Sequence, residues 1–150
     1  MPDLIYLDYN CFQRGFDDQR QVRIRMETVA CEAVFSKAED GEVHLVWSFM
    51  HEDESALCPF PERKLEAASL SALCRTRMGP TEDVRRMALS FQRKAPLSAK
   101  DALHLACARV AGANVLLTCD DEFLKLASRA APDVESLNPV DYVRRKEGGW

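Results

Sequence analysis

The stretch Leu97–Asp121, LSAKDALHLACARVAGANVLLTCDD, is the part of the sequence that decides the fold. Ser98 near its start is typical of a helix cap, and Gly112 is typical of a helix end. The apolar run Asn114–Thr118 then predicts a buried strand, which two aspartates follow. An acid beyond the end of a strand in an α/β chain stands where ligand sites usually lie.

Similar patterns extend outward from this unit to both ends of the chain. Further strands are predicted at Leu4–Leu7 and Val43–Trp47, with an edge-like fourth strand at Val134–Leu137. Helices are predicted from about Gln21 to Asp40, after Ser48, from Leu65 to Gly79, from Thr81 to Pro96, at Asp121–Ala130 and from Pro139. Since strands alternate with helices and no linker intervenes, we expect one domain over residues 1–150. The expected fold is α/β, a three-layer α/β/α sandwich with a mainly parallel central sheet, because right-handed crossovers place helices on both faces.

Composition narrows the class of protein. The chain of 150 residues is 47% hydrophobic and 29% charged, which is typical of a soluble globular protein. No apolar run approaches the roughly 18 residues that a membrane span needs. The N-terminus, MPDLIYLDYN, has an acid where a secretory signal has basic residues, so we expect a cytoplasmic location. The net charge of −4 argues against a module that binds nucleic acid by charge alone, and less against an enzyme whose acids bind divalent cations.

The cysteines show no pattern of a known metal or redox motif. None of the six forms a C-x-x-C pair, and no cluster has zinc-finger spacing. In a reducing compartment they are expected to be free thiols packed at apolar helical positions. Cys11 and Cys119 flank acidic motifs and are the two candidates for a place near a site.

Acidic residues follow each of the first three predicted strands. Asp8 follows the first strand and Asp120 the third, while Glu52 and Glu54 lie about one helical turn past the second. Asp101 opens the helix that leads into the third strand. Because the carboxyl ends of parallel strands share one edge of a sheet, these carboxylates are expected to meet in one cleft.

Each acid also has a purely structural explanation. Ser98-x-x-Asp101 and Thr118-x-x-Asp121 are patterns of helix capping, and Asp8 is also a plausible end of a strand. The joint placement favours a site, since several acids at one edge repel one another unless a cation neutralises them. Oxygen ligands with few histidines fit Mg²⁺ or Mn²⁺ and fit zinc poorly.

The chain resembles a known family, the PIN-domain ribonucleases of the VapC-type toxins found in toxin–antitoxin pairs. The segments that carry the resemblance are IYLDYNCF with Asp8 and Asn10, VWSFMHEDES with Ser48 and Glu54, SAKDALHLACA with Asp101, and VLLTCDDEFLK with Thr118 and Asp120. Their order and spacing cover most of the chain, and the loop FQRGFDDQRQVRIRME resembles that of a subgroup of PIN proteins. Tyr9 departs from the family, in which a threonine or serine is more usual.

The resemblance implies roles for individual residues. The catalytic, metal-binding acids of the family are matched by Asp8, Glu54, Asp101 and Asp120. Supporting polar positions are matched by Asn10, Thr118 and Asp121. Arg14 and Lys100 are weaker candidates for binding substrate phosphates, with a solvated surface as the alternative. His104, one turn beyond Asp101, is expected to be a packed, hydrogen-bonded residue behind the site rather than a ligand.

The implied function is Mg²⁺- or Mn²⁺-dependent hydrolysis of RNA phosphodiester bonds by a toxin that a small antitoxin holds in check. A non-catalytic PIN-like module that binds RNA or protein, and another acid-site phosphohydrolase, remain alternatives. The apolar sides of Leu65–Met78 and Val84–Phe91 suit a homodimer or a partner's helix, and core packing explains them equally well. The RNA target, the number of metal ions, the oligomeric state and the existence of an antitoxin are not predicted by the sequence.

Overall fold

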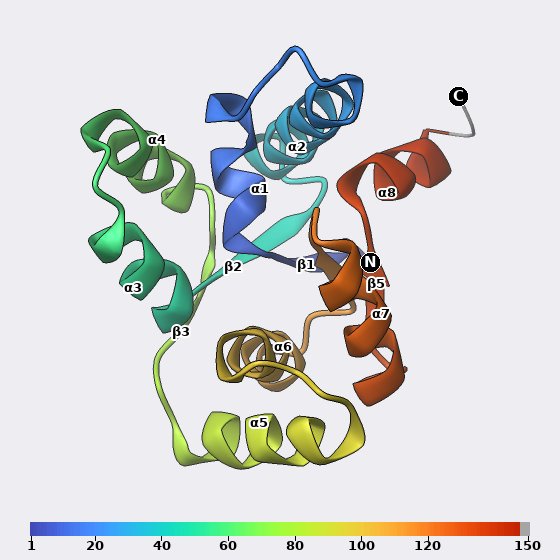
Figure 1. The fold of residues 1–150 in the computed structure, drawn as a ribbon. Helices are drawn as coiled ribbons and strands as arrows, with labels where there is room; N and C mark the ends of the chain where they lie inside the picture. The colour runs from blue at the N-terminus through green and yellow to red at the C-terminus, as the bar shows by residue number, and fades with distance from the viewer. Residues whose placement is uncertain (148–150) are drawn as a thin grey trace.

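A parallel β-sheet runs through the middle of the computed structural model, which describes residues 1–147 of the chain (Figure 1). The strands are β1 (Leu4–Leu7), β2 (His44–Ser48), β3 (Thr76–Met78), β4 (Val115–Leu117) and β5 (Glu135–Leu137). Within the described residues they form one sheet in the order β3-β2-β1-β4-β5, and every pair is parallel. The predicted α/β class with a mainly parallel sheet is therefore confirmed, and β5 is the expected edge strand.

Helices cover both faces of this sheet. Their bounds are α1 (Tyr9–Gln13), α2 (Val22–Glu39), α3 (Phe49–Leu57), α4 (Pro61–Ser71), α5 (Glu82–Lys94), α6 (Ala99–Ala111), α7 (Asp121–Ala130) and α8 (Pro139–Lys146). In Figure 1, α1 and α2 lie on one side of the sheet and α5 and α6 on the other. Across residues 1–147, no helix combines the length and the apolar character that a membrane crossing requires.

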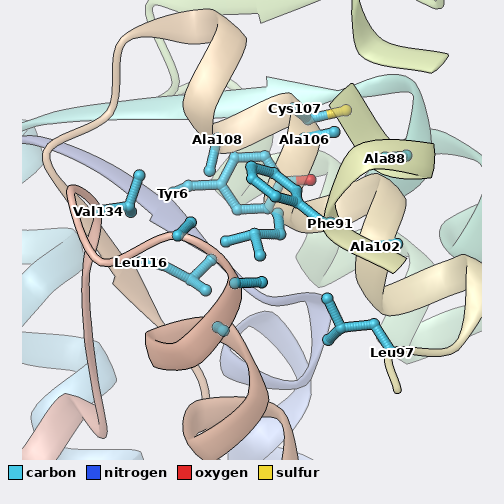
Figure 2. Packing of buried hydrophobic residues seen from close by; sticks show 14 of the residues in the cluster. Tyr6, Ala88, Phe91, Leu97, Ala102, Ala106, Cys107, Ala108, Leu116 and Val134 are labelled. Carbon is cyan, nitrogen blue, oxygen red and sulfur yellow. The ribbon is translucent and has the colours of Figure 1, made fainter. Parts of the chain in front are cut away.

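The two faces of β1 explain the three layers. Ile5 and Leu7 are fully buried in the core under α1 and α2, whereas Tyr6 between them is fully buried in the core on the opposite face. Side chains alternate along a strand in this way, so a strand buried on both faces is apolar throughout. Figure 2 shows the Tyr6 ring packed among residues of that second core, including Phe91 and Leu116.

Both predicted ends of the helix in Leu97–Asp121 are confirmed. Ser98 caps α6, its side chain accepting a hydrogen bond from the backbone N–H of Asp101 at 3.1 Å. Gly112 ends the helix with a φ of 82°, in the left-handed region that favours glycine. Gly41, which follows the end of α2, has a φ of 80° for the same reason.

The structure corrects the predicted helix from Leu65 to Gly79. Helix α4 ends at Ser71, and Thr76–Met78 is the edge strand β3. Thr76 pairs with Val46 and Met78 with Ser48 of β2, so the pairing is set by a strand about thirty positions away. A three-residue strand has too short a pattern to outweigh the helical spacing around it.

A second correction concerns FQRGFDDQ, the start of the predicted loop FQRGFDDQRQVRIRME. The chain instead forms α1 and then a 3₁₀ turn, Arg14–Phe16. Asp8 caps α1, and its side chain accepts the backbone N–H of Tyr9 at 2.8 Å. The helix therefore begins immediately after β1, and its capping residue is one of the predicted site acids.

Candidate metal centre

The site is built where the carboxyl ends of β1, β2 and β4 meet. Asp8 directly follows β1, and its backbone N–H donates to the carbonyl of Leu117, the last residue of β4, at 2.8 Å. Ser48 is both the last residue of β2 and the cap of α3. Each strand thus leads at once into a helix or a short connection, which fixes the first side chains beyond the sheet.

The four acids predicted from the sequence all line one cavity of about 410 Å³. They come from the end of β1 (Asp8), from α3 (Glu54), from the first turn of α6 (Asp101) and from the cap of α7 (Asp120). Residues that are up to 112 positions apart are therefore brought to one place, as the parallel-sheet argument requires.

Asp8 lies deepest and is held by neutral donors. Its carboxylate accepts hydrogen bonds from the Thr118 hydroxyl at 2.7 Å and from the Asn10 amide at 3.2 Å, besides the Tyr9 N–H. Burial raises the pKa of Asp8 above its ordinary value, and the charge of Glu54 adds to the rise, although His104 and Thr118 oppose it. Asn10 and Thr118, predicted as supporting residues, both contact Asp8.

Asp101 and Asp120 are placed by helix starts. Asp120 caps α7, and its carboxylate accepts the backbone N–H groups of Glu122 and Phe123 at 3.0 and 3.2 Å. The cap of α7 is thus Asp120 itself, whereas the sequence suggested Thr118. Burial raises the pKa of Asp101, and the charges of Asp8 and Asp120 raise it further.

Glu54 is fixed by a chain of buried hydrogen bonds. The Nε2 atom of His104 contacts its Oε1 atom, and its Oε2 atom lies 3.4 Å from the Nζ atom of Lys100. Burial alone would raise the pKa of Glu54, but His104 and Lys100 hold it below its ordinary value. On the far side of the imidazole ring, Nδ1 lies 2.6 Å from the Tyr6 hydroxyl, which lies 2.7 Å from the Ser48 hydroxyl.

The imidazole ring of His104 lies between Glu54 and Tyr6, with Nε2 facing the carboxylate and Nδ1 facing the hydroxyl. His104 is completely buried, as expected for a residue that supports the site from behind. His51 packs beside it, and burial together with His104 lowers the pKa of His51 to about 3. His51 donates to the carbonyl of Leu7 at 2.6 Å and thereby ties α3 to β1.

Two of the predicted site residues, Arg14 and Asp121, lie away from the cavity. Arg14 is bound to Glu27 at 2.7 Å and to Asp17 at 3.0 Å, so its guanidinium is occupied within the fold. Asp121 is paired with Arg23 at 2.7 Å on the surface. Neither Arg14 nor Asp121, predicted as a phosphate-binding and a supporting residue, lines the acidic cavity among the described residues. Lys100 does line it.

Arg63 is a lining residue that sequence reasoning missed. Its guanidinium lies over the rings of Phe16 and Phe60, at 5.5 and 5.1 Å from their centres, beside the acids. It reaches the cavity from the first turn of α4, and no motif around Pro61 signals that position. Stacking on aromatic rings fixes the orientation of a guanidinium group, which suits contact with a phosphate.

The donor set fits a hard divalent cation. Carboxylate oxygens dominate it, and atoms of Asp8, Glu54 and His104 lie within 4.8 Å of one another. The imidazole nitrogen of His104 that faces the cavity is already used by Glu54, which leaves oxygen ligands. Mg²⁺ and Mn²⁺ favour such ligands, and their charge would offset the burial and the repulsion between acids that raise the pKa values of Asp8 and Asp101.

Comparisons with known proteins agree with this geometry. The chain is similar in fold to the crystal structure of FitAcB from Neisseria gonorrhoeae, with a TM-score of 0.60, 21% sequence identity and coverage of 90% of this chain and 97% of that chain. No curated protein sequence matched the chain. The PIN domain matches residues 5–129, a range that contains all four acids of the cavity. With most of its length matched, this chain belongs to the PIN domain family.

Proposed function

We propose that this protein is a cytoplasmic, Mg²⁺- or Mn²⁺-dependent endoribonuclease, whose single domain over residues 1–150 hydrolyses RNA phosphodiester bonds. PIN domains are generally nucleases. The observation that carries the proposal is the meeting of Asp8, Glu54, Asp101 and Asp120 at one cavity. Helix capping accounts for the positions of individual acids, but it gives no reason for four of them to face one another.

In this mechanism the four acids would hold the cation at the edge of the sheet where the parallel strands end. When bound, the divalent cation would lower the pKa of a water molecule and offset charge on the phosphate. Thr118 and Asn10 keep the carboxylate of Asp8 in one orientation, because both donate to it. His104 does the same for Glu54. The chain therefore supplies position and charge, and no side chain acts as a covalent nucleophile.

Lys100 and Arg63 are the residues that we assign to the substrate phosphates. Both line the cavity, and both carry a positive charge beside the acids. The Nζ atom of Lys100 lies 3.4 Å from Glu54, so a phosphate that enters near the acids comes within its reach. Salt bridges to the phosphate backbone position a nucleic acid without reading its sequence.

We further propose that the protein is the toxin of a toxin–antitoxin pair, on the strength of the resemblance in its sequence segments. The apolar side of Val84–Phe91 on α5, which also suited a partner's helix, packs in the core, because Val84 and Phe91 are buried. Leu57 on α3, Phe60 in the turn and Leu65 on α4 are exposed, and Phe60 also lines the acidic cavity. We assign this apolar surface to the antitoxin or to a second copy of the chain.

The test is cleavage of labelled single-stranded RNA by the purified protein with Mg²⁺, with Mn²⁺ and with EDTA. We expect cleavage with either cation and none with EDTA. Asp8→Asn and Asp101→Asn should each reduce the rate by at least about 100-fold, because cation-based charge stabilisation is worth several kcal/mol and each 1.4 kcal/mol is tenfold. Asp53→Asn is the matched control, since Asp53 precedes Glu54 but is exposed outside the cavity.

Other outcomes would contradict the proposal in distinct ways. Cleavage that persists in both acid variants would indicate a contaminating nuclease or a different site. Tight RNA binding without cleavage under any metal condition would favour the non-catalytic alternative. Release of inorganic phosphate from monoesters without cleavage of RNA would favour the phosphohydrolase.

A further inference from the structure

A cluster of three cysteines lies behind the acidic cavity and is not used by the proposed reaction. Cys11 is on α1, Cys31 is on α2 and Cys119 is in the connection between β4 and α7. Their sulfur atoms all lie within 4.8 Å of one another, and in the described chain all three are free thiols. We propose that these cysteines form a second metal site, which binds a thiophilic cation such as Cu⁺, Zn²⁺ or Cd²⁺ through three thiolates.

The spacing of the sulfur atoms is close to that of a three-thiolate site. A metal–sulfur bond of about 2.3 Å in a trigonal arrangement separates the sulfur atoms by roughly 4.0 Å. Shifts of less than about 1 Å would therefore bring sulfur atoms within 4.8 Å to bonding positions. Rotation of a cysteine side chain about one bond produces shifts of this size without a change in the backbone.

The surroundings select a soft cation over Mg²⁺. Thiolates favour Cu⁺ and Zn²⁺, whereas Mg²⁺ takes oxygen ligands. Glu27, the buried carboxylate in this region, is bound to Arg14, Arg23 and Asn138 and is not free to be a ligand. With three ligands, the site suits Cu⁺ better than Zn²⁺, which normally takes four.

The cluster has its own route to solvent. Cys11 and Cys31 line a cavity of about 370 Å³, together with residues of α2 and α4 such as Phe35 and Leu70. None of the three cysteines lines the acidic cavity. An ion entering on this side would therefore reach the sulfur atoms without passing the acids, although the cysteines themselves are no more than 7% exposed.

The position of the cluster gives it a structural consequence. Cys11 follows Asn10, which donates to Asp8, and Cys119 precedes Asp120. A cation bound to all three sulfurs would join α1 and α2 to the segment that carries Asp120. Because metal binding to the native state adds to folding stability, the bound ion should raise the thermal midpoint of unfolding.

The test uses the reduced, full-length protein freed of metal with a chelator. Titration with Cd²⁺ should produce the ultraviolet charge-transfer absorption of cadmium thiolates, saturating at one ion per chain, and should raise the thermal midpoint. Competition with chromogenic chelators, one for Cu⁺ and one for Zn²⁺, should give a lower dissociation constant for Cu⁺ than for Zn²⁺. Cys31→Ser should weaken binding by more than about 100-fold, beyond the 10- to 100-fold typical of changes outside the ligand shell.

Two matched variants separate this site from others. Cys74→Ser replaces a buried cysteine outside the cluster and should leave the cadmium titration unchanged. Asp101→Asn should also leave it unchanged, so failure of the nuclease proposal does not affect this result. The proposal is overturned if the folded wild-type protein shows no thiolate absorption, or if Cys31→Ser, shown to be folded by circular dichroism, binds Cd²⁺ as tightly as the wild type.

Discussion

Two regions of the molecule contain buried carboxylates. In one region the charge is neutralised by neighbouring side chains, and in the other the neighbouring side chains include further acids. Glu27 on α2 is completely buried and is bound to Arg14 at 2.7 Å, Arg23 at 3.1 Å and Asn138 at 2.5 Å. Burial alone would raise the pKa of Glu27, but these three partners outweigh it and hold the pKa below its ordinary value.

In the acidic cavity the balance is reversed. The pKa values of Asp8 and Asp101 are raised by burial, and neighbouring carboxylates add to the rise. In the described chain no hydrogen bond reaches the carboxylate of Asp101. A buried acid that forms ion pairs within the chain contributes to the stability of the fold. Acids that repel one another need an external cation to neutralise their charge. The carboxylate neutralised within the fold is therefore distinguished from the acids that we assign to the cation by their surroundings alone.

The largest expected effect on stability is at Glu27. Glu27→Gln should lower the free energy of unfolding at neutral pH by about 2–3 kcal/mol, because it removes the buried negative charge that Arg14 and Arg23 contact and leaves Arg14 with Asp17 alone. RNA cleavage below the melting temperature should be unchanged. Urea unfolding followed by circular dichroism measures the first quantity, and Glu32→Gln, at an exposed position on the same helix, is the control.

The pH dependence of that difference has a defined sign. Since the pKa of Glu27 is lowered on folding, its stabilising contribution is present above the ordinary value of 4.5 and is lost as the pH falls through the lowered pKa. The gap between wild type and Glu27→Gln should therefore shrink in acid. A gap that stays constant from pH 7 to pH 3 would mean that the ion pairs contribute nothing.

A smaller effect is expected from the hydrogen bonds that support the cavity. Tyr6→Phe removes the hydroxyl that contacts His104 and Ser48, at a cost of about 1–2 kcal/mol of unfolding free energy. Because His104 orients Glu54, we also expect weaker binding of Mg²⁺ and slower cleavage. Titration of the variant with Mg²⁺ in the cleavage assay measures both.

Tyr142→Phe provides the comparison for that variant. Tyr142 is also buried, and its hydroxyl donates to Asp3 at 2.6 Å, in a region that does not line the acidic cavity. It should lose a similar amount of stability and keep the Mg²⁺ dependence of the wild type. If both variants cleave alike, Tyr6 has a structural role alone.

The cavity was more accessible to sequence reasoning than the Glu27 cluster, for a physical reason. Strand ends and helix caps are local patterns, so Asp8, Asp101 and Asp120 were placed from short segments together with the rule that parallel strands end at one edge. Glu27 has no local signal of burial, because its partners Arg14 and Asn138 lie 13 and 111 positions away. The convergence of the three cysteines is hidden from the sequence for the same reason.

The fold shows the same division between local and distant causes. The apolar runs of β1, β2 and β4 identify buried strands without further information. Thr76–Met78 contains an arginine and becomes a strand because β2 offers it an edge to pair with. Arg63 likewise lies at the site in contact with two aromatic rings, Phe16 and Phe60, and no motif predicts this arrangement.

The smallest expected effect on stability tests the difference between the two regions most directly, because the substitution of a site residue is expected to stabilise the protein. In EDTA at neutral pH, Asp101→Asn should raise the free energy of unfolding, since it removes an acid repelled by Asp8 and Asp120. The gain should not exceed about 1 kcal/mol, because water in the open cavity screens the repulsion and the charge also favours the first turn of α6. Addition of Mg²⁺ should then stabilise the wild type more than the variant.

The sign of the pH dependence distinguishes this explanation from a general effect of removing charge. A carboxyl group whose pKa is raised on folding contributes stability below its ordinary pKa of 3.8, and that contribution is lost as the pH rises through the raised value. The advantage of Asp101→Asn should thus be present at pH 7 and vanish near pH 3. Asp121→Asn removes an exposed acid whose pKa its partner Arg23 lowers, so it should shift stability in the opposite direction. If both variants were stabilising in EDTA, the gain would reflect the net negative charge of the chain, and the acidic cavity would hold no special demand for a cation.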